Sequence, residues 1–281
     1  MMDLWYSLIN MLPFEWTEYG FMKSALLAVM IISPAIALTG TMVVGNRMSF
    51  FSHVIGHSAL TGLAVGLLFS TSDPRPVMIL FAVILAVAIN IFLSVTKADG
   101  DTVMGVFASA TTAFGIALLS RGGSFSKYTV YLIGDILSIT PSEIAYLAII
   151  LAAVIFFWVF LAGRISLISV ESSLLYGKII NPFVVKTAFS ILVALIVILS
   201  IKWVGILIIN SLFILPAAAA RIHAKNLRSY FALSALIGLI SGIAGLMISY
   251  YTESSCGAAV VLVSAGIYAI SVLLKHIRRS I

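Results

Sequence analysis

The chain has 281 residues, of which 62% are hydrophobic and only 9% are charged, and its mean hydropathy is +1.19. Soluble domains carry roughly 25% charged residues, so this composition excludes a water-facing globule and indicates a protein of the bilayer. The net charge is +6, but the 16 lysines and arginines are spread along the chain without a basic patch, which excludes a nucleic-acid partner. The single Cys256 excludes an intrachain disulfide and a cysteine-based zinc or iron-sulfur site.

Nine apolar windows of about 20 residues, the length that crosses a hydrocarbon core, follow one another along the chain. They predict an all-α fold, a polytopic transmembrane helical bundle that forms one domain over residues 1–281. Only Lys202 and Trp203 separate the sixth window from the seventh, so these two form either a tight hairpin or one broken element, and eight spans are also possible. The windows are 21–44, 49–70, 76–95, 102–119, 142–161, 184–201, 204–220, 230–251 and 258–274.

The basic residues divide unequally between the two sides of the membrane when the amino terminus is placed outside. Five fall in outside segments: Lys23, Arg75, Arg121, Lys127 and Lys202. Eleven fall in inside segments: Arg47, Lys97, Arg164, Lys178, Lys186, Arg221, Lys225, Arg228, Lys275, Arg278 and Arg279. Because lysine and arginine accumulate in cytoplasmic loops, this division predicts a multi-pass protein of the inner (plasma) membrane with its carboxyl terminus in the cytoplasm.

Between the fourth and fifth windows lies a short apolar run, residues 128–137, interrupted by Gly134 and Asp135. At about ten residues it is too short to cross the membrane, and an interfacial or re-entrant segment is predicted. Inside the spans, Asn90 and Asn210 are expected to hydrogen-bond across helices. Two glycine pairs with a spacing of four residues are expected to let helices pack closely within the chain: Gly62 with Gly66, and Gly238 with Gly242.

The clearest candidates for chemistry are His53 and His57, near the start of the second window. A separation of four residues places both imidazoles on one helix face, which is the geometry for two ligands of one metal ion. His57 lies about 12 Å along the helix from Ser49, which approaches the middle of the membrane. The competing interpretation is that each histidine hydrogen-bonds to a neighbouring helix. The segment lacks the glutamate of a helical metalloprotease motif, and the chain has no phosphate loop and no nucleophile cluster, so no enzyme is predicted.

Three stretches together resemble a known family: NRMSFFSHVIGHSALTG (46–62), YLIGDIL (131–137) and VGILIINSLFILPAAAAR (204–221). The family is that of the membrane permease subunits of bacterial and archaeal ATP-binding-cassette importers for zinc, manganese and iron, and the resemblance covers residues 40–274. It implies a permease dimer on two cytoplasmic ATPase subunits, with an extracellular metal-binding protein that delivers the ion. The ion is the transported substrate, and no resident cofactor is expected.

The resemblance also implies roles for individual residues. His57 matches the family's histidine of the second span, whereas His53 stands where the family usually has aspartate. Replacing a hard carboxylate by imidazole disfavours manganese and favours zinc. In the long inside segment, ATPase coupling is expected around Glu171 and Gly177, of which Gly177 matches a recurrent glycine. The alternative function is a self-contained cation transporter or channel that uses the same histidines without an ATPase.

Overall fold

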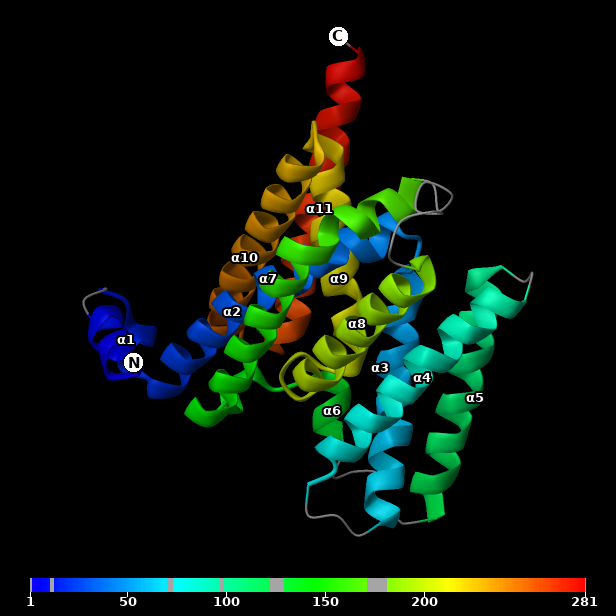
Figure 1. The fold of residues 1–281 in the computed structure, drawn as a ribbon. Coiled ribbons are helices and arrows are strands. Elements are labelled where there is room, and N and C mark those ends of the chain that lie inside the picture. The colour runs from blue at the N-terminus through cyan, green and yellow to red at the C-terminus, as the bar shows by residue number, and fades with distance from the viewer. Residues whose placement is uncertain are drawn as a thin grey trace.

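The computed structural model describes residues 2–10, 13–69, 73–96, 99–121, 129–170 and 181–280, and within these ranges it is helical and contains no strand. This confirms the all-α bundle (Figure 1). Two short 3-10 helices are present, η1 (Glu15–Glu18) and η3 (Ile136–Ser138). The α-helices are α1 (Met2–Ile9), α2 (Gly20–Gly45), α3 (Ser49–Leu68), α4 (Arg75–Val95), α5 (Gly100–Arg121), α6 (Thr129–Ile133), α7 (Pro141–Val170), α8 (Pro182–Val204), α9 (Ile206–His223), α10 (Leu227–Thr252) and α11 (Cys256–Ser280).

Each of the nine predicted windows corresponds to one helix. In the described part of the chain, eight helices are long and apolar enough to cross a membrane, and the seventh window corresponds to α9, a shorter apolar helix. The carboxyl end of α11 lies at the top of Figure 1, and the adjoining ends of α3 and α4 lie at the bottom. We call the upper side inner, because it holds the excess of basic residues, and the lower side outer.

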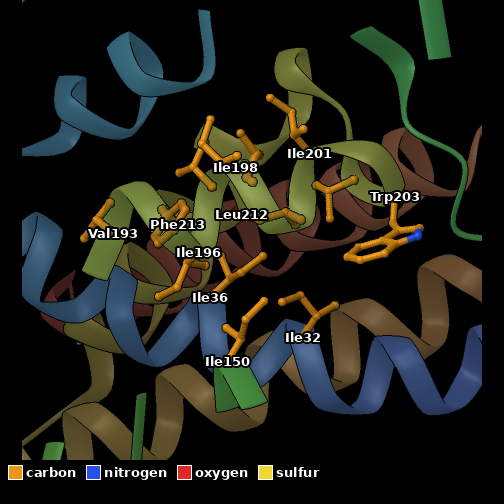
Figure 2. Packing of buried hydrophobic residues seen from close by; sticks show 14 of the residues in the cluster. Ile32, Ile36, Ile150, Val193, Ile196, Ile198, Ile201, Trp203, Leu212 and Phe213 are labelled. Atoms are coloured by element: carbon orange, nitrogen blue, oxygen red, sulfur yellow. The ribbon is translucent and has the colours of Figure 1, made fainter. Parts of the chain in front are cut away.

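The helices divide into a central and a peripheral set. Buried residues make up 67%, 72% and 61% of the membrane windows of α2, α3 and α8, but only between 22% and 33% of those of α4, α5, α7, α10 and α11. The central helices meet α9 in a continuous apolar core. Figure 2 shows this core where α2 (Ile32 and Ile36), α7 (Ile150), α8 (Val193, Ile196, Ile198, Ile201 and Trp203) and α9 (Leu212 and Phe213) converge.

The junction between α8 and α9 is a corner made by one residue. Gly205 has φ +89° and ψ 148°, a conformation that is essentially restricted to glycine. From this corner α8 packs mainly on α4 and α3, whereas α9 packs on α2, α11 and α10. The element is therefore broken into two diverging helices and does not form a closely packed hairpin (Figure 1).

The segment between α5 and α7 rests on this corner from the outer side. Its helices, α6 and η3, have five and three residues, which confirms that it does not cross the membrane. Gly134 has φ +79°, and a Cβ atom on it would lie 2.3 Å from the Val204 carbonyl carbon. The Asp135 amide donates a hydrogen bond of 3.1 Å to the Lys202 carbonyl. Two glycine backbones thus pack directly against each other at this point.

The two predicted glycine pairs pack helices within the chain. A Cβ atom on Gly62 would lie 3.0 Å from Met78 Cα, and Gly66 faces Pro74, so this pair brings α3 close to α4. The second pair, Gly238 and Gly242, packs α10 against Ser33 and its neighbours on α2. The prediction of intrachain packing is confirmed at both pairs.

Candidate metal centre

His53 and His57 lie on one face of α3, as their spacing predicts. Their ring centroids are 4.3 Å apart, with an angle of 57° between the ring planes. His53 is exposed and His57 is half-buried. Imidazoles this close together can both ligate a single ion, since metal–nitrogen distances are about 2.0–2.1 Å.

The rest of α3 explains why the two imidazoles point away from the core. Positions beside them, including Ser52, Val54, Gly56 and Ser58, are buried against α4, α5, α8 and α9. α3 packs on α9 at Gly56, where an added Cβ atom would make an ordinary contact of 3.7 Å with Ile209. Packing on several sides therefore fixes the rotation of α3, and on its histidine face His53 stays exposed while His57 is half-buried.

A hydrogen bond ties the turn that precedes His53 to α9. The Ser52 hydroxyl donates to the Asn210 amide oxygen at 2.5 Å. Asn210 thus bonds across helices, as predicted. The same prediction is wrong for Asn90, whose amide donates to the Ala86 carbonyl of its own helix at 2.8 Å.

The histidine pair gains no third ligand from the described part of the chain. There, no group of three or more histidine, cysteine, aspartate or glutamate side chains is arranged to hold a metal ion. The other two histidines, His223 and His276, lie at the inner ends of α9 and α11. The pair can therefore contribute half of a tetrahedral coordination shell, and the remaining ligands must come from outside these residues.

Glu143 and Lys202 form an ion pair that was not predicted from the sequence. Lys202 Nζ lies 2.6 Å from Glu143 Oε1, and the Glu143 side chain is only 8% exposed. Thr140 donates two further hydrogen bonds to the same carboxylate, from its amide and its hydroxyl, at 3.0 Å each. A lysine between two apolar windows was the available signal, but its partner lies 59 residues earlier in the chain.

A pocket of about 150 Å³ lies beside this ion pair, between the outer ends of α4 and α8. Its charged lining residues are Lys202, Asp73 and Arg75. Burial disfavours the charge on Asp73, but hydrogen bonds from Arg75 outweigh burial and lower the pKa of the carboxyl group. Because each of these charges has an opposite partner, the pocket presents a neutralised ion network.

The expected coupling residues, Glu171 and Gly177, lie outside the residues that the structure describes. The inner end of α7 at Val170 and the inner start of α8 at Pro182 are described. Coupling through this segment stays a prediction.

The fold and the site define a polytopic membrane protein that presents paired imidazoles at membrane depth. The ABC 3 transport family model matches residues 18–275, and the chain belongs to this family. It is 32% identical over 260 residues to the high-affinity zinc uptake system membrane protein ZnuB of Haemophilus influenzae. This alignment covers 90% of this chain and 97% of the relative. It is 28% identical over 262 residues to the manganese transport system membrane protein MntC of Listeria innocua. This second alignment covers 91% of this chain and 91% of the relative.

A solved structure has the same fold. PsaBC from Streptococcus pneumoniae, in complex with Fab, aligns with a TM-score of 0.79 over 96% of this chain and 95% of that chain, at 22% identity. Family membership and the apolar helices together make this chain a multi-pass protein of the plasma membrane.

Proposed function

We propose that this chain is the permease subunit of an ATP-driven importer of divalent transition metals, with zinc as its substrate. The observation that carries the proposal is the pair His53 and His57 on one face of α3, in a chain of the ABC 3 transport family. The names of its relatives support metal import, since one is a zinc uptake protein and another a manganese transport protein. Two imidazoles favour zinc over manganese, which prefers oxygen ligands.

The translocation path forms between two copies of the chain. A polar side chain that faces hydrocarbon is costly, so His53 is expected to face protein or water. A twofold axis beside α3 would bring the histidine pairs of two copies together, and four neutral imidazoles would complete a tetrahedral shell for zinc. Alternating access would then expose this shell to one side of the membrane and afterwards to the other.

ATP hydrolysis takes place on separate subunits at the inner face, and a metal-binding protein delivers the ion at the outer face. The sequence contains no phosphate loop, which supports an ATPase on another chain. The coupling contact is expected around Glu171 and Gly177. A bulky Gly177→Trp substitution should uncouple transport from ATP hydrolysis while membrane insertion is retained. Uphill metal transport by the purified chain without an ATPase would contradict this arrangement and favour a self-contained transporter.

Competitive uptake of zinc and manganese by cells that express single variants tests the metal site. We expect His57→Ala to abolish uptake of both ions, because the remaining imidazole cannot hold the ion. His53→Asp restores a hard oxygen ligand and should shift selectivity toward manganese. His223→Ala is the matched control, because it removes an imidazole at the inner end of α9, away from the pair. Expression of all variants is matched by immunoblot of membranes.

The outcome that contradicts the metal site is wild-type uptake by His57→Ala. Both histidines would then have only a packing role. If His53→Asp left the ratio of zinc uptake to manganese uptake unchanged, the metal site would stand, but His53 would not be the residue that selects the metal.

A further inference from the structure

Basic residues gather at the inner ends of three neighbouring helices. They are Arg221 at the end of α9, Lys225 and Arg228 around the start of α10, and Lys275 near the end of α11, where Arg278 and Arg279 follow in sequence. We call this set the inner cationic cluster. In the described part of the chain, the inner carboxylates are Asp99 and Asp101 at the start of α5, which packs mainly on α3 and to a smaller extent on α4. The cluster is therefore not neutralised by them.

The packing of α9 on α11 brings two parts of the cluster to one level. These helices run in the same direction from the outer corner, where a Cβ atom on Gly257 would lie 2.9 Å from Ile208 Cδ1. His223, the last residue of α9, is as far along the chain from Ile208 as Val272 is from Gly257. With a rise of about 1.5 Å per residue in both helices, the inner end of α9 is roughly level with Val272, one turn before Lys275, and Lys225 follows two residues after this end.

The packing of α10 on α11 gives the same level independently. These helices run in opposite directions, and a Cβ atom on Gly245 would lie 2.5 Å from Val260 Cα. The number of residues from Arg228 to Gly245 equals the number from Val260 to Ile277. Arg228 is thus roughly level with Ile277, within the basic turns of α11. Two separate helix contacts assemble the cluster on one short band of the inner surface.

The side of α11 that leads to this band is apolar and uncovered. Ile270, Leu273, Leu274 and Ile277 have exposed fractions of 58%, 61%, 50% and 54%. The exposed turns continue toward the basic residues at the carboxyl end, which projects beyond the rest of the bundle in Figure 1. An apolar helix surface that ends in lysine and arginine matches the change from acyl chains to headgroups in a membrane leaflet.

We infer that the inner cationic cluster binds the headgroups of anionic phospholipids of the inner leaflet. Basic clusters directly on the cytoplasmic side of a spanning helix attract anionic lipid. Removing one lysine or arginine charge weakens the binding about fivefold. The ATPase is the competing occupant. It is disfavoured because α11 packs mainly on α9 and α10, whereas the helices that flank the expected coupling segment, α7 and α8, pack mainly on α2, α4 and α3.

Lipid binding to the purified full chain in detergent tests this inference, with native mass spectrometry to count bound phosphatidylglycerol and phosphatidylcholine. Both Lys225 and Lys275 are exposed. The double variant K225Q/K275Q should bind phosphatidylglycerol about 30-fold more weakly, while phosphatidylcholine binding is unchanged. The double variant K225R/K275R keeps the charge and should bind like the parent. Lys186→Gln removes an exposed inner charge from α8, outside the cluster, and should also bind like the parent.

Three results would overturn the inference. The first is phosphatidylglycerol binding by K225Q/K275Q with the parent's affinity. The second is an equal loss in Lys186→Gln, which would indicate a response to total charge and not to the cluster. The third is retained phosphatidylglycerol binding together with lost copurification of the ATPase, which would assign this surface to the protein partner. Binding by K225R/K275R at the parent's level also verifies that the glutamine pair acts through charge.

Discussion

Replacing Gly205 by alanine should strongly destabilise the protein. The residue has φ +89° and ψ 148°, which costs other residues about 1–3 kcal/mol. The new Cβ atom would also lie 2.4 Å from the Ile133 carbonyl carbon and oxygen. Backbone cannot move aside as a flexible side chain does, so overpacking adds about 1–3 kcal/mol. The sum is a loss of about 2–6 kcal/mol in the free energy of unfolding.

Unfolding of the purified chain in mixed micelles, with an increasing fraction of SDS, measures this loss. Gly105→Ala is the matched control, because Gly105 is exposed inside α5 and no atom lies within 4 Å of its added Cβ. That substitution should be neutral or stabilise by up to about 1 kcal/mol through helix propensity. Gly134→Ala should repeat the loss, since its Cβ would meet the other side of the same contact. Equal stability of Gly205→Ala and Gly105→Ala would refute the argument from close backbone packing.

Two further predictions concern the outer ion pair and the direction of the chain. Lys202→Met leaves the Glu143 carboxylate buried without its partner, and should cost less than the roughly 3–5 kcal/mol of a fully buried pair because Lys202 is 36% exposed. Adding Glu143→Gln should recover part of this loss in the same SDS titration, and full additivity would contradict the pairing. In a Cys256→Ser background, a cysteine at Ser254 should react with an impermeant thiol reagent in intact cells, and one at Thr96 should not. Labelling of Thr96→Cys would reverse the assigned sides.

The spans could be predicted from hydropathy because a helix that crosses the membrane is apolar both where it faces lipid and where it faces the interior of the bundle. The same signal cannot rank the helices by burial. The most buried span, α3, has the lowest hydropathy, 1.4, whereas α4 and α7 reach 2.8 with 33% and 28% of their windows buried. Lipid-facing helices must be apolar around most of their surface, but a central helix can hold serine, threonine, glycine and histidine against its neighbours. Hydropathy therefore does not separate the two sets, since the central helix α8 reaches 2.6 whereas the peripheral helix α5 has only 1.8.

The corner at Gly205 could not be predicted, because its cause is not local. The predicted break at Lys202 and Trp203 lies close to it, but the chain has 20 glycines and no local pattern shows that Gly205 adopts a positive φ. Its conformation is required by contact with Gly134, which lies far earlier in the chain and itself has positive φ. The ion pair of Glu143 and Lys202 is also not local, since it joins the start of α7, directly after the outer segment, to the end of α8. Such pairs emerge only once the helices are placed in three dimensions.

At the histidines, the sequence and the structure each explain a different feature. The spacing of His53 and His57 predicts a shared face, and the measured ring separation of 4.3 Å agrees. That His53 is exposed and His57 half-buried could not be predicted, because exposure depends on how the surrounding helices fix the rotation of α3. The Ser52 hydroxyl donates to Asn210, so it does not satisfy the imidazoles. Two polar rings at membrane depth with no described partner beyond each other must face another chain, water or an ion, and hydrocarbon is the one environment that their chemistry excludes.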